Sequence, residues 1–434
     1  MSSLLALLAL ATLGGNDTKT ASPEAVETPA TTGVALFASK VLTCAWDGPQ
    51  AVDNAVVLVK DGKIERIGRA SDVDVPEGYE RVDYGDRWLA PGMVELHCHE
   101  AGASLYSGIN DLNDTVYLVN PGMRASTAVD PGNHSMKMAV AGGVTTVLYI
   151  PGSGSNIGGQ GVTLKTGHDT YAENYVRDPG SMKLAQWGNP EGWGPGVGMT
   201  FEDWNTRNTF KRGIVYAKAW KDFEDGKGPE PQRNITFDVW RHLYANEIAV
   251  STHTQMYQVV LSTLTMIRGE LEMPVFLDHS TIGGWLTGAM AKEMGVPAIV
   301  GPRSADTTSR GMINWQRNKH EGFRGVAAGY QERGMEMVGF NTDSPVIPQE
   351  ELSVNAAMGA RYGMKDERNQ ILRGLTIVPA RTAKIDHRVG SLEAGKDADI
   401  LIVNGHPADP RTAVDAVWVD GENVYDAERD GRRW

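Results

Sequence analysis

Histidine and aspartate close four apolar, strand-like runs that are spread along this 434-residue chain. The runs read VELHCHE, IAVSTHTQ, PVFLDHS and MVGFNTDSP, and in each the polar residue follows a short apolar stretch. This pattern is typical of strands that are buried on both faces of a parallel sheet. Because the carboxyl ends of parallel barrel strands meet at one mouth, we expect these polar side chains to lie close together. They are His97, His99, His253, His279 and Asp343.

The spacing of the first two histidines supports a shared function. Successive side chains of a strand point to opposite faces, so His97 and His99 share one face and Cys98 points to the other. Neutral imidazole and carboxylate are natural ligands of zinc and similar divalent ions. A lone buried histidine is usually a core residue, but the paired spacing and the repeated placement at strand ends favour a metal site. The other histidines lack this context: His134, His168, His242, His320, His387 and His406.

The composition restricts the classes of partner. The chain has 41 Lys and Arg against 54 Asp and Glu, a net charge of −13, and no basic run. This balance argues against nucleic acid or an anionic membrane as the main partner. No apolar run reaches the roughly 18 residues that a membrane span needs. We therefore expect a small-molecule substrate. The composition does not decide whether identical subunits assemble into an oligomer.

Cysteine usage adds little to this picture. The two cysteines, Cys44 and Cys98, are too few for a disulfide framework or a thiolate zinc site.

The N-terminus has the pattern of a secretion signal. Residues 4–13 form an apolar run that contains a small-residue Ala-Leu-Ala site, although the basic segment that usually precedes such a run is absent. Residues 16–33 are rich in Thr, Ala, Pro and charge, as in a solvated linker. We therefore expect residues 1–33 to be a signal-like segment and linker, and a periplasmic or secreted location ahead of a cytoplasmic one. The alternative is a frayed terminus.

Two β-rich segments lie near the ends of the remaining chain. Residues 55–68 alternate apolar and polar positions around an Asp-Gly turn, which predicts a hairpin. Residues 398–405 and 416–426 repeat the pattern, with Asp420-Gly421 as the turn of the second segment. Neither segment forms a full sheet alone, so we expect both to pair in one small β-sandwich made from residues 34–90 and 388–426.

Residues 91–387 contain eight apolar runs that we interpret as barrel strands, with helical segments between the later ones. The amphipathic pattern of residues 201–223 predicts one such helix. The predicted strands span about 94–99, 144–150, 162–166, 181–187, 248–253, 275–279, 296–301 and 336–342.

Several motifs, in their order and spacing, resemble one family. They are LAPGMVELHCHE, AGGVTTVLYIPG, NIGGQGVTLK, the three later ligand runs and GSLEAGKDADILIVNG. Over about residues 34–426 the chain resembles the amidohydrolase superfamily of metal-dependent hydrolases, in its imidazolonepropionase-like and prolidase-like branch. The resemblance implies an α/β fold, a (β/α)8 TIM barrel with a small β-sandwich built from both chain ends. It also implies one or two divalent metals, zinc first, with manganese, iron or cobalt as alternatives.

The resemblance assigns roles to the strand-end residues. The four histidines would bind metal. Asp343 would be a weak metal ligand and the general base that accepts a proton from activated water. Asp343 precedes Ser344-Pro345, so a turn-capping role is the alternative interpretation.

A lysine decides whether a second metal is expected. In prolidase-like members a lysine of the fourth strand is carboxylated and bridges two metals, and GSMKLAQWG offers Lys183. A related branch carries a glutamate a few residues later, where this chain has Gly188. Lys165 and Lys218 are weaker alternatives. An ordinary salt-bridging lysine is the competing interpretation of Lys183.

Two Gly-rich segments are candidates for shaping the pocket. Residues 156–161, NIGGQG, lack the Gly-Lys-Ser/Thr ending of a nucleotide loop. We expect a tight turn at the mouth there, with Gln160 as a candidate substrate contact. The segment 188–200 would lie above the mouth after the fourth strand, or would be an irregular surface loop.

The expected reaction is hydrolysis of an amide or another C–N bond, with a dipeptide or N-acyl amino acid as substrate. Aminohydrolases of the superfamily commonly carry a glutamate three residues after a ligand histidine, but here Met256 and Ile282 occupy those positions. The alternatives are a deaminase, a hydrolase of a cyclic amide or imidazolone, and an inactive barrel that acts as a binding protein.

Overall fold

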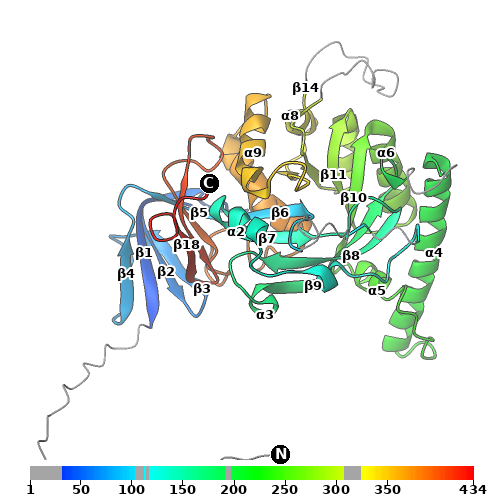
Figure 1. Ribbon diagram of the computed structural model, residues 1–434, viewed down its shortest axis with the longest axis horizontal. Coiled ribbons are helices and arrows are strands. Elements are labelled where there is room, and N and C mark those ends of the chain that lie inside the picture. The colour runs from blue at the N-terminus through cyan, green and yellow to red at the C-terminus, as the bar shows by residue number, and fades with distance from the viewer. Residues whose placement is uncertain (1–31, 103–111, 114–116, 191–196, 307–323) are drawn as a thin grey trace, which may run out of the picture.

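The computed structural model describes residues 32–102, 112–113, 117–190, 197–306 and 324–434. A β-sheet region built from both chain ends packs beside a larger α/β barrel (Figure 1). The predicted signal-like segment falls almost entirely outside the described residues. None of the helices in the described part of the chain is long and apolar enough to cross a membrane.

The two ends of the chain form one sheet. Its strand order is β18-β17-β16-β5-β1-β2-β3, and β4 pairs with β1. Strand β16 from the C-terminal part pairs antiparallel with β5 from the N-terminal part. These strands are β1 (Gly33–Leu42), β2 (Ala51–Lys60), β3 (Lys63–Arg69), β4 (Tyr79–Asp83), β5 (Trp88–Pro91), β16 (Ile400–Val403), β17 (Val414–Val419) and β18 (Glu422–Asp426).

Local sequence explains how this sheet turns and packs. Asp61 and Gly62 join β2 to β3 with positive φ angles of 50° and 74°, which suits the tight turn of a twisted hairpin. Leu36 and Val57 from one half of the sheet share a buried cluster with Ile400 from the other half. The two halves therefore bury a common apolar layer, and the exact domain boundaries that the sequence predicts stay predictions.

The barrel sheet contains eight strands in the order β15-β12-β11-β10-β9-β8-β7-β6. Each lies at or next to a strand that the sequence predicts, with ends that differ by several residues. They are β6 (Met93–Cys98), β7 (Val144–Tyr149), β8 (Ile157–Lys165), β9 (Tyr175–Ala185), β10 (Ala249–Met256), β11 (Val275–Ile282), β12 (Ala298–Val300) and β15 (Val338–Phe340).

The direction of β8 departs from a regular (β/α)8 barrel. Strand β8 pairs antiparallel with both β7 and β9. Only residues 150–156 join β7 to β8, which is too short for the crossover helix that parallel neighbours require. The expectation of eight equivalent βα units is therefore wrong at the third strand. The expectation of a tight turn over residues 156–161 is also wrong, because residues 157–161 begin β8.

A segment after β6 completes the wall beside β8. Strand β7 pairs only with the second half of β8, residues 162–165, so the first half needs another partner on that side. Residues 119–124 occupy this place: Asn120 N–H donates to the carbonyl of Ile157 (2.7 Å) and Gln160 N–H donates to the carbonyl of Met123 (2.8 Å). The Gln160 side chain is buried and donates to the carbonyl of Pro121 (2.9 Å).

The sheet nearly closes between its first and last strands. Cys98 forms a parallel bridge with Ser344, and His99 N–H donates to the Ser344 carbonyl (3.1 Å). Deeper in the same seam, the Glu95 carboxylate accepts hydrogen bonds from the backbone and hydroxyl of Thr342 at 2.7 and 2.8 Å. The end of β6 and the segment after β15 are therefore joined.

Helices cover the later strands (Figure 1). The helix predicted for residues 201–223 is confirmed as α4. The α-helices are α2 (His134–Ala141), α3 (Tyr171–Asn174), α4 (Met199–Glu224), α5 (Val239–Tyr244), α6 (Tyr257–Ser262), α7 (Gly288–Glu293), α8 (Val326–Gln331), α9 (Leu352–Arg361), α10 (Gln370–Leu375) and α11 (Ile377–Thr382). The short elements are η1 (Ala125–Ala128), a π-helix η3 (Thr263–Glu270), η4 (Gly284–Thr287), η5 (Gln349–Glu351), η6 (Glu367–Asn369), β13 (Ala305–Asp306) and β14 (Arg324–Gly325).

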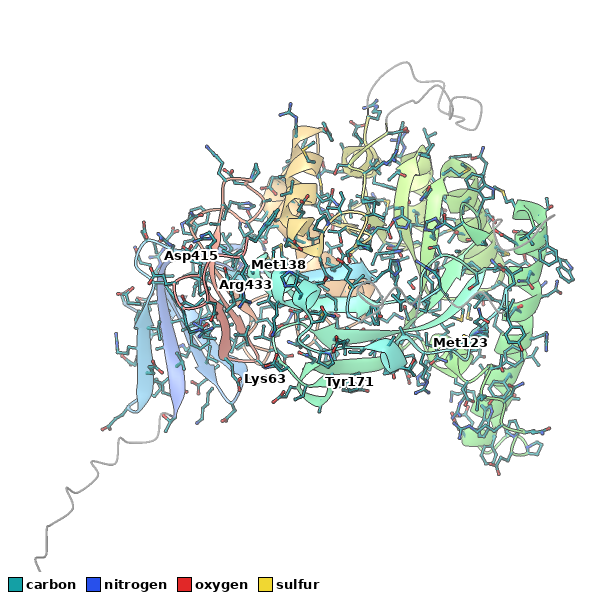
Figure 2. The ribbon with its side chains drawn as sticks, in the orientation of Figure 1. Lys63, Met123, Met138, Tyr171, Asp415 and Arg433 are labelled. Atoms are coloured by element: carbon teal, nitrogen blue, oxygen red, sulfur yellow. The ribbon has the colours of Figure 1, made fainter. Side chains whose placement is uncertain are left out.

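The reversed direction of β8 delivers Lys165 to the junction of barrel and sheet. The buried Lys165 ammonium lies 2.5 Å from Asp399 Oδ2, 3.1 Å from Asp397 Oδ2 and 3.4 Å from Asp420 Oδ1. Lys63, which Figure 2 places at this junction, also pairs with Asp397. Lys165 therefore holds the two parts together, and its candidacy as a metal bridge is wrong.

Replacing Lys165 with methionine should destabilise the protein. The change leaves three carboxylates at this junction without their central cation, and breaking a buried ion pair typically costs about 3–5 kcal/mol. Chemical denaturation would measure the loss. Lys137→Met is the control, because Lys137 forms only an exposed pair with Asp169 at 3.9 Å and should cost less than about 1 kcal/mol. Equal losses in the two variants would contradict the structural role of Lys165.

Candidate metal centre

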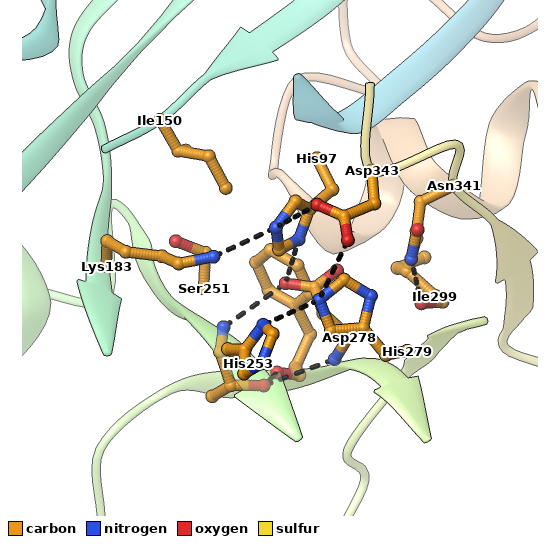
Figure 3. A network of polar contacts seen from close by, with 12 residues as sticks. His97, Ile150, Lys183, Ser251, His253, Asp278, His279, Ile299, Asn341 and Asp343 are labelled. Atoms are coloured by element: carbon orange, nitrogen blue, oxygen red, sulfur yellow. Dashed lines mark hydrogen bonds and ion pairs between the residues drawn. The ribbon is translucent and has the colours of Figure 1, made fainter. Parts of the chain in front are cut away.

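Figure 3 shows His97, His253, His279 and Asp343 gathered at one place in the barrel. The Asp343 carboxylate lies among three imidazoles. Its Oδ1 is 3.4 Å from Nε2 of His97 and 3.5 Å from Nε2 of His99. Its Oδ2 is 3.9 Å from Nε2 of His279. One ligand atom each from His97, His279 and Asp343 lie within 4.8 Å of one another, which is close enough for one metal ion.

Backbone carbonyls fix the ring orientation of two of these histidines. His99 Nδ1 lies 2.9 Å from the carbonyl oxygen of Ile150, and His279 Nδ1 lies 3.0 Å from that of Gly301. A carbonyl can only accept, so each Nδ1 carries the proton. Each Nε2 therefore presents a lone pair to the centre, as metal-binding histidines usually do.

The geometry of His253 fits a bound cation. Its Nδ1 lies 3.0 Å from Nε2 of His279, and its own Nε2 is buried with no hydrogen-bond partner in the described structure. His279 Nε2 carries a lone pair, so an unprotonated His253 Nδ1 would place a second lone pair against it and the two would repel. A proton or a metal ion between these nitrogens removes the repulsion.

The electrostatics favour neutral imidazoles beside an ionised carboxylate. Burial, aided by neighbouring cationic groups, lowers the pKa of His97 and of His253 well below the usual range, and burial lowers that of His279 to about 4. Burial alone would raise the pKa of Asp343, but His279 and His99 lower it to about 2. Neutral imidazoles with one carboxylate form a donor set that suits zinc and similar divalent ions.

Lys183 also enters this centre, from β9. Its amine lies 2.9 Å from Nε2 of His97 (Figure 3). Burial lowers the pKa of Lys183 to about 8, so the neutral amine that carboxylation requires is accessible. Lys218, by contrast, is exposed on α4, so this second alternative is wrong.

The backbone is strained where the ligands are presented. His279, Ser280 and Asp343 adopt positive φ angles of 65°, 55° and 51°. Non-glycine residues rarely occupy this region, and such strain is concentrated at functional sites. Two of the three strained residues, His279 and Asp343, are predicted metal ligands.

Gly188 lies against His253. Its φ angle is 112°, and a Cβ atom added there would lie 3.3 Å from His253 Nε2. The glutamate that a related branch carries near this position would thus be strained and crowded here. Residues 191–196 of the predicted mouth segment 188–200 lie outside the described residues.

The sequence predictions missed two buried acids of the centre. Glu95 accepts a hydrogen bond from the backbone of His97 (2.8 Å) and, as described, joins β6 to Thr342. Asp278 Oδ2 lies 3.3 Å from Nδ1 of His97. Burial raises the pKa of Glu95 to about 8 and that of Asp278 well above its usual range. The sequence held a signal for both, since Glu95 stands two positions before His97 and Asp278 directly precedes His279.

Comparisons with known proteins agree with this geometry. The model of the Amidohydrolase family matches residues 287–424. The amidohydrolase tasK of Hapsidospora irregularis is 25% identical over 413 residues, which are 88% of this chain and 40% of tasK. The chain thus spans less than half the length of that relative.

Solved structures extend the likeness to nearly the whole chain. An amidohydrolase from Thermotoga maritima matches with a TM-score of 0.78 and 26% identity, over 91% of this chain and all of that one. A prolidase crystallised with N-methylphosphonate-L-proline matches with a TM-score of 0.56 and 14% identity, over 91% of this chain and 100% of its own. The second likeness shows the fold alone. These matches confirm the resemblance to amidohydrolases that the sequence motifs indicate.

Replacing His253 with alanine should remove most of the bound metal. Purified wild-type protein should carry at least one equivalent of a divalent transition metal, because neutral imidazole ligands dominate the centre. Elemental analysis of the two proteins would measure this. His242→Ala is a matched control, since His242 is exposed and pairs with Glu247. Full metal retention in His253→Ala would exclude His253 as a ligand.

Proposed function

We propose that this amidohydrolase-like chain is a metal-dependent hydrolase that cleaves the amide bond of a dipeptide or an N-acyl amino acid. The position of Asp343 carries the proposal. Its carboxylate contacts three histidines at the mouth, and its low pKa keeps it ionised at neutral pH. A divalent metal held by His97, His99, His253, His279 and Asp343, most simply zinc, would polarise the substrate carbonyl and lower the pKa of water.

Asp343 would transfer the proton during hydrolysis. An ionised carboxylate can accept the proton of the attacking water and return it to the amide nitrogen as the C–N bond breaks. Burial would raise the pKa of Asp343, but the basic groups around it, His279, His99 and Lys183, lower it to about 2. The backbone of Asp343 is in the left-handed region, with a φ angle of 51°, as is common at functional sites.

The other acids near the centre favour amide cleavage over deamination. Protonation of an aromatic ring calls for a further carboxylate that can approach the substrate. Met256 and Ile282 occupy the positions where superfamily aminohydrolases commonly carry a glutamate. Glu95 accepts hydrogen bonds from the backbone of His97 and from Thr342, so it is committed to the barrel seam. Asp343 is then the carboxylate best placed to reach a substrate.

Lys183 supports a centre with two metals. A buried amine with a lowered pKa can react with carbon dioxide to give a carbamate, whose two oxygens can each bind an ion. The contact with His97 places the amine among the predicted ligands. We therefore assign Lys183 as the bridging ligand in the proposed enzyme.

A hydrolysis panel tests the proposed function. Zinc-loaded protein should release amino acids from dipeptides or N-acyl amino acids and should release no ammonia from adenine, guanine or cytosine derivatives. Amino-acid analysis and an ammonia assay would measure the two products. Ammonia release without peptide or N-acyl cleavage would favour the deaminase alternative. No turnover by a metal-loaded protein on any substrate would favour a binding protein.

Asp343→Asn links the activity to the centre. Asparagine keeps the shape of the side chain but cannot accept the proton, so kcat should fall by about 10²-fold or more. Steady-state kinetics on the best substrate of the panel would measure the change. A metal-loaded Asn variant with wild-type kcat would remove Asp343 from its role.

The state of Lys183 can be tested by reconstitution. If Lys183 forms a carbamate, recovery of activity from metal-free protein should require bicarbonate, and the two ions should lie about 3.5–4 Å apart. Lys183→Ala should bind less metal than wild type and regain activity with short carboxylic acids that replace the carbamate. An unmodified lysine in a crystal structure of the active, metal-loaded enzyme would refute the bridge.

A further inference from the structure

Asp278 is a buried acid that faces a histidine of another strand. It directly precedes His279 on β11, yet its Oδ2 lies 3.3 Å from Nδ1 of His97 on β6. Both side chains are fully buried. Figure 3 shows Asp278 between His97 and the β10–β11 side of the centre.

The two nitrogens of His97 have different neighbours. Nε2 faces the Lys183 amine at 2.9 Å and the Asp343 carboxylate at 3.4 Å, whereas Nδ1 faces Asp278. A neutral imidazole has one N–H and one lone pair. If the proton were on Nε2, the Nδ1 lone pair would face the lone pairs of Asp278. With the proton on Nδ1, the N–H lies 3.3 Å from Asp278 Oδ2, an ion–dipole contact that falls short of hydrogen-bond geometry. The Nε2 lone pair then faces the Lys183 amine, which can donate to it at 2.9 Å.

The neighbouring strand holds Asp278 in this position. Thr252 N–H on β10 donates to Oδ2 of Asp278 (3.2 Å), and the backbone N–H of Asp278 donates to the Thr252 hydroxyl (3.1 Å). The other oxygen, Oδ1, is buried with no hydrogen-bond partner among the described residues. A buried carboxylate with an unsatisfied oxygen is costly, so stability alone gives no reason for an acid here.

We infer that Asp278 is a positioning residue, which holds His97 in the Nδ1–H form so that Nε2 is available to a metal. The inference rests on the proposed function and assigns one of its supporting residues. Carboxylates that orient metal-binding histidines in this way commonly raise metal affinity by about 10–100-fold. Asp278 acts on the metal through His97 and is not proposed to touch the substrate.

Glu95 provides a matched control. It is as deeply buried as Asp278 and also touches His97, but only through the backbone N–H (2.8 Å). Its other oxygen joins Thr342 at the barrel seam. Loss of Glu95 should therefore weaken the fold, whereas loss of Asp278 should change the chemistry of the His97 ring.

Zinc affinity separates the two roles. Competition with a chelator would measure the zinc Kd of wild type, Asp278→Leu, Asp278→Asn and Glu95→Gln. Asp278→Leu should bind zinc about 10–100-fold more weakly. Asp278→Asn should recover most of this loss, because its amide oxygen can still accept from Nδ1. Glu95→Gln should lower Tm, and among the folded molecules it should weaken zinc binding far less than Asp278→Leu does.

The tautomer of His97 gives an independent readout. Nitrogen NMR of metal-free, histidine-labelled protein should show the His97 proton on Nδ1 in wild type and in Asp278→Asn, and a loss of this preference in Asp278→Leu. Wild-type zinc affinity in Asp278→Leu, or equal weakening in Asp278→Leu and Glu95→Gln, would overturn the inference. If wild type binds no zinc, the proposed function fails, and the tautomer measurement still decides the role of Asp278.

Discussion

The seam between the first and last barrel strands is the constraint on which this centre depends. Glu95 reaches across the seam to the backbone and hydroxyl of Thr342, and Ser344 pairs with the end of β6 beyond it. Asp343 lies between these two attachments, so its carboxylate must face His97 and His99. Without this seam the sheet would be open. Glu95 and Thr342 are 247 positions apart in the chain, and the ligands beside them would not share a site.

Burial then determines what chemistry the assembled side chains can perform. The same low-dielectric surroundings keep the imidazoles neutral and make the neutral Lys183 amine accessible, so the donors are ready for a metal without first losing protons. The acids in the centre respond differently. The pKa of Asp343 is lowered to about 2 among the basic groups His279, His99 and Lys183, whereas burial raises the pKa of Glu95 and that of Asp278. The centre thus contains carboxylic acids whose pKa values are shifted in opposite directions.

The sequence predicts the parts of this protein that depend on local pattern. Apolar runs place every barrel strand, and polar residues at the ends of those runs identify the side chains that the structure brings together. Strand direction could not be predicted in this way, because a run such as 157–165 looks the same whether it is parallel or antiparallel to its neighbours. Asp278 and Glu95 were missed for a related reason. Their positions next to ligand histidines mark both as candidates, but the atom that each faces across the barrel follows from the fold alone.

Residues 119–124 form part of the loop region at the barrel mouth and also pair with β8 as part of the barrel sheet. Loops at a barrel mouth can usually vary freely, because the strands beneath them are already paired. Here half of β8 takes its hydrogen bonds on one side from this segment, including those at Ile157 and Gln160. Shortening it would leave buried backbone groups without partners. Only changes that preserve the strand-like path of this segment are therefore compatible with the barrel. The shape of the mouth cannot change here without also affecting the pairing of β8.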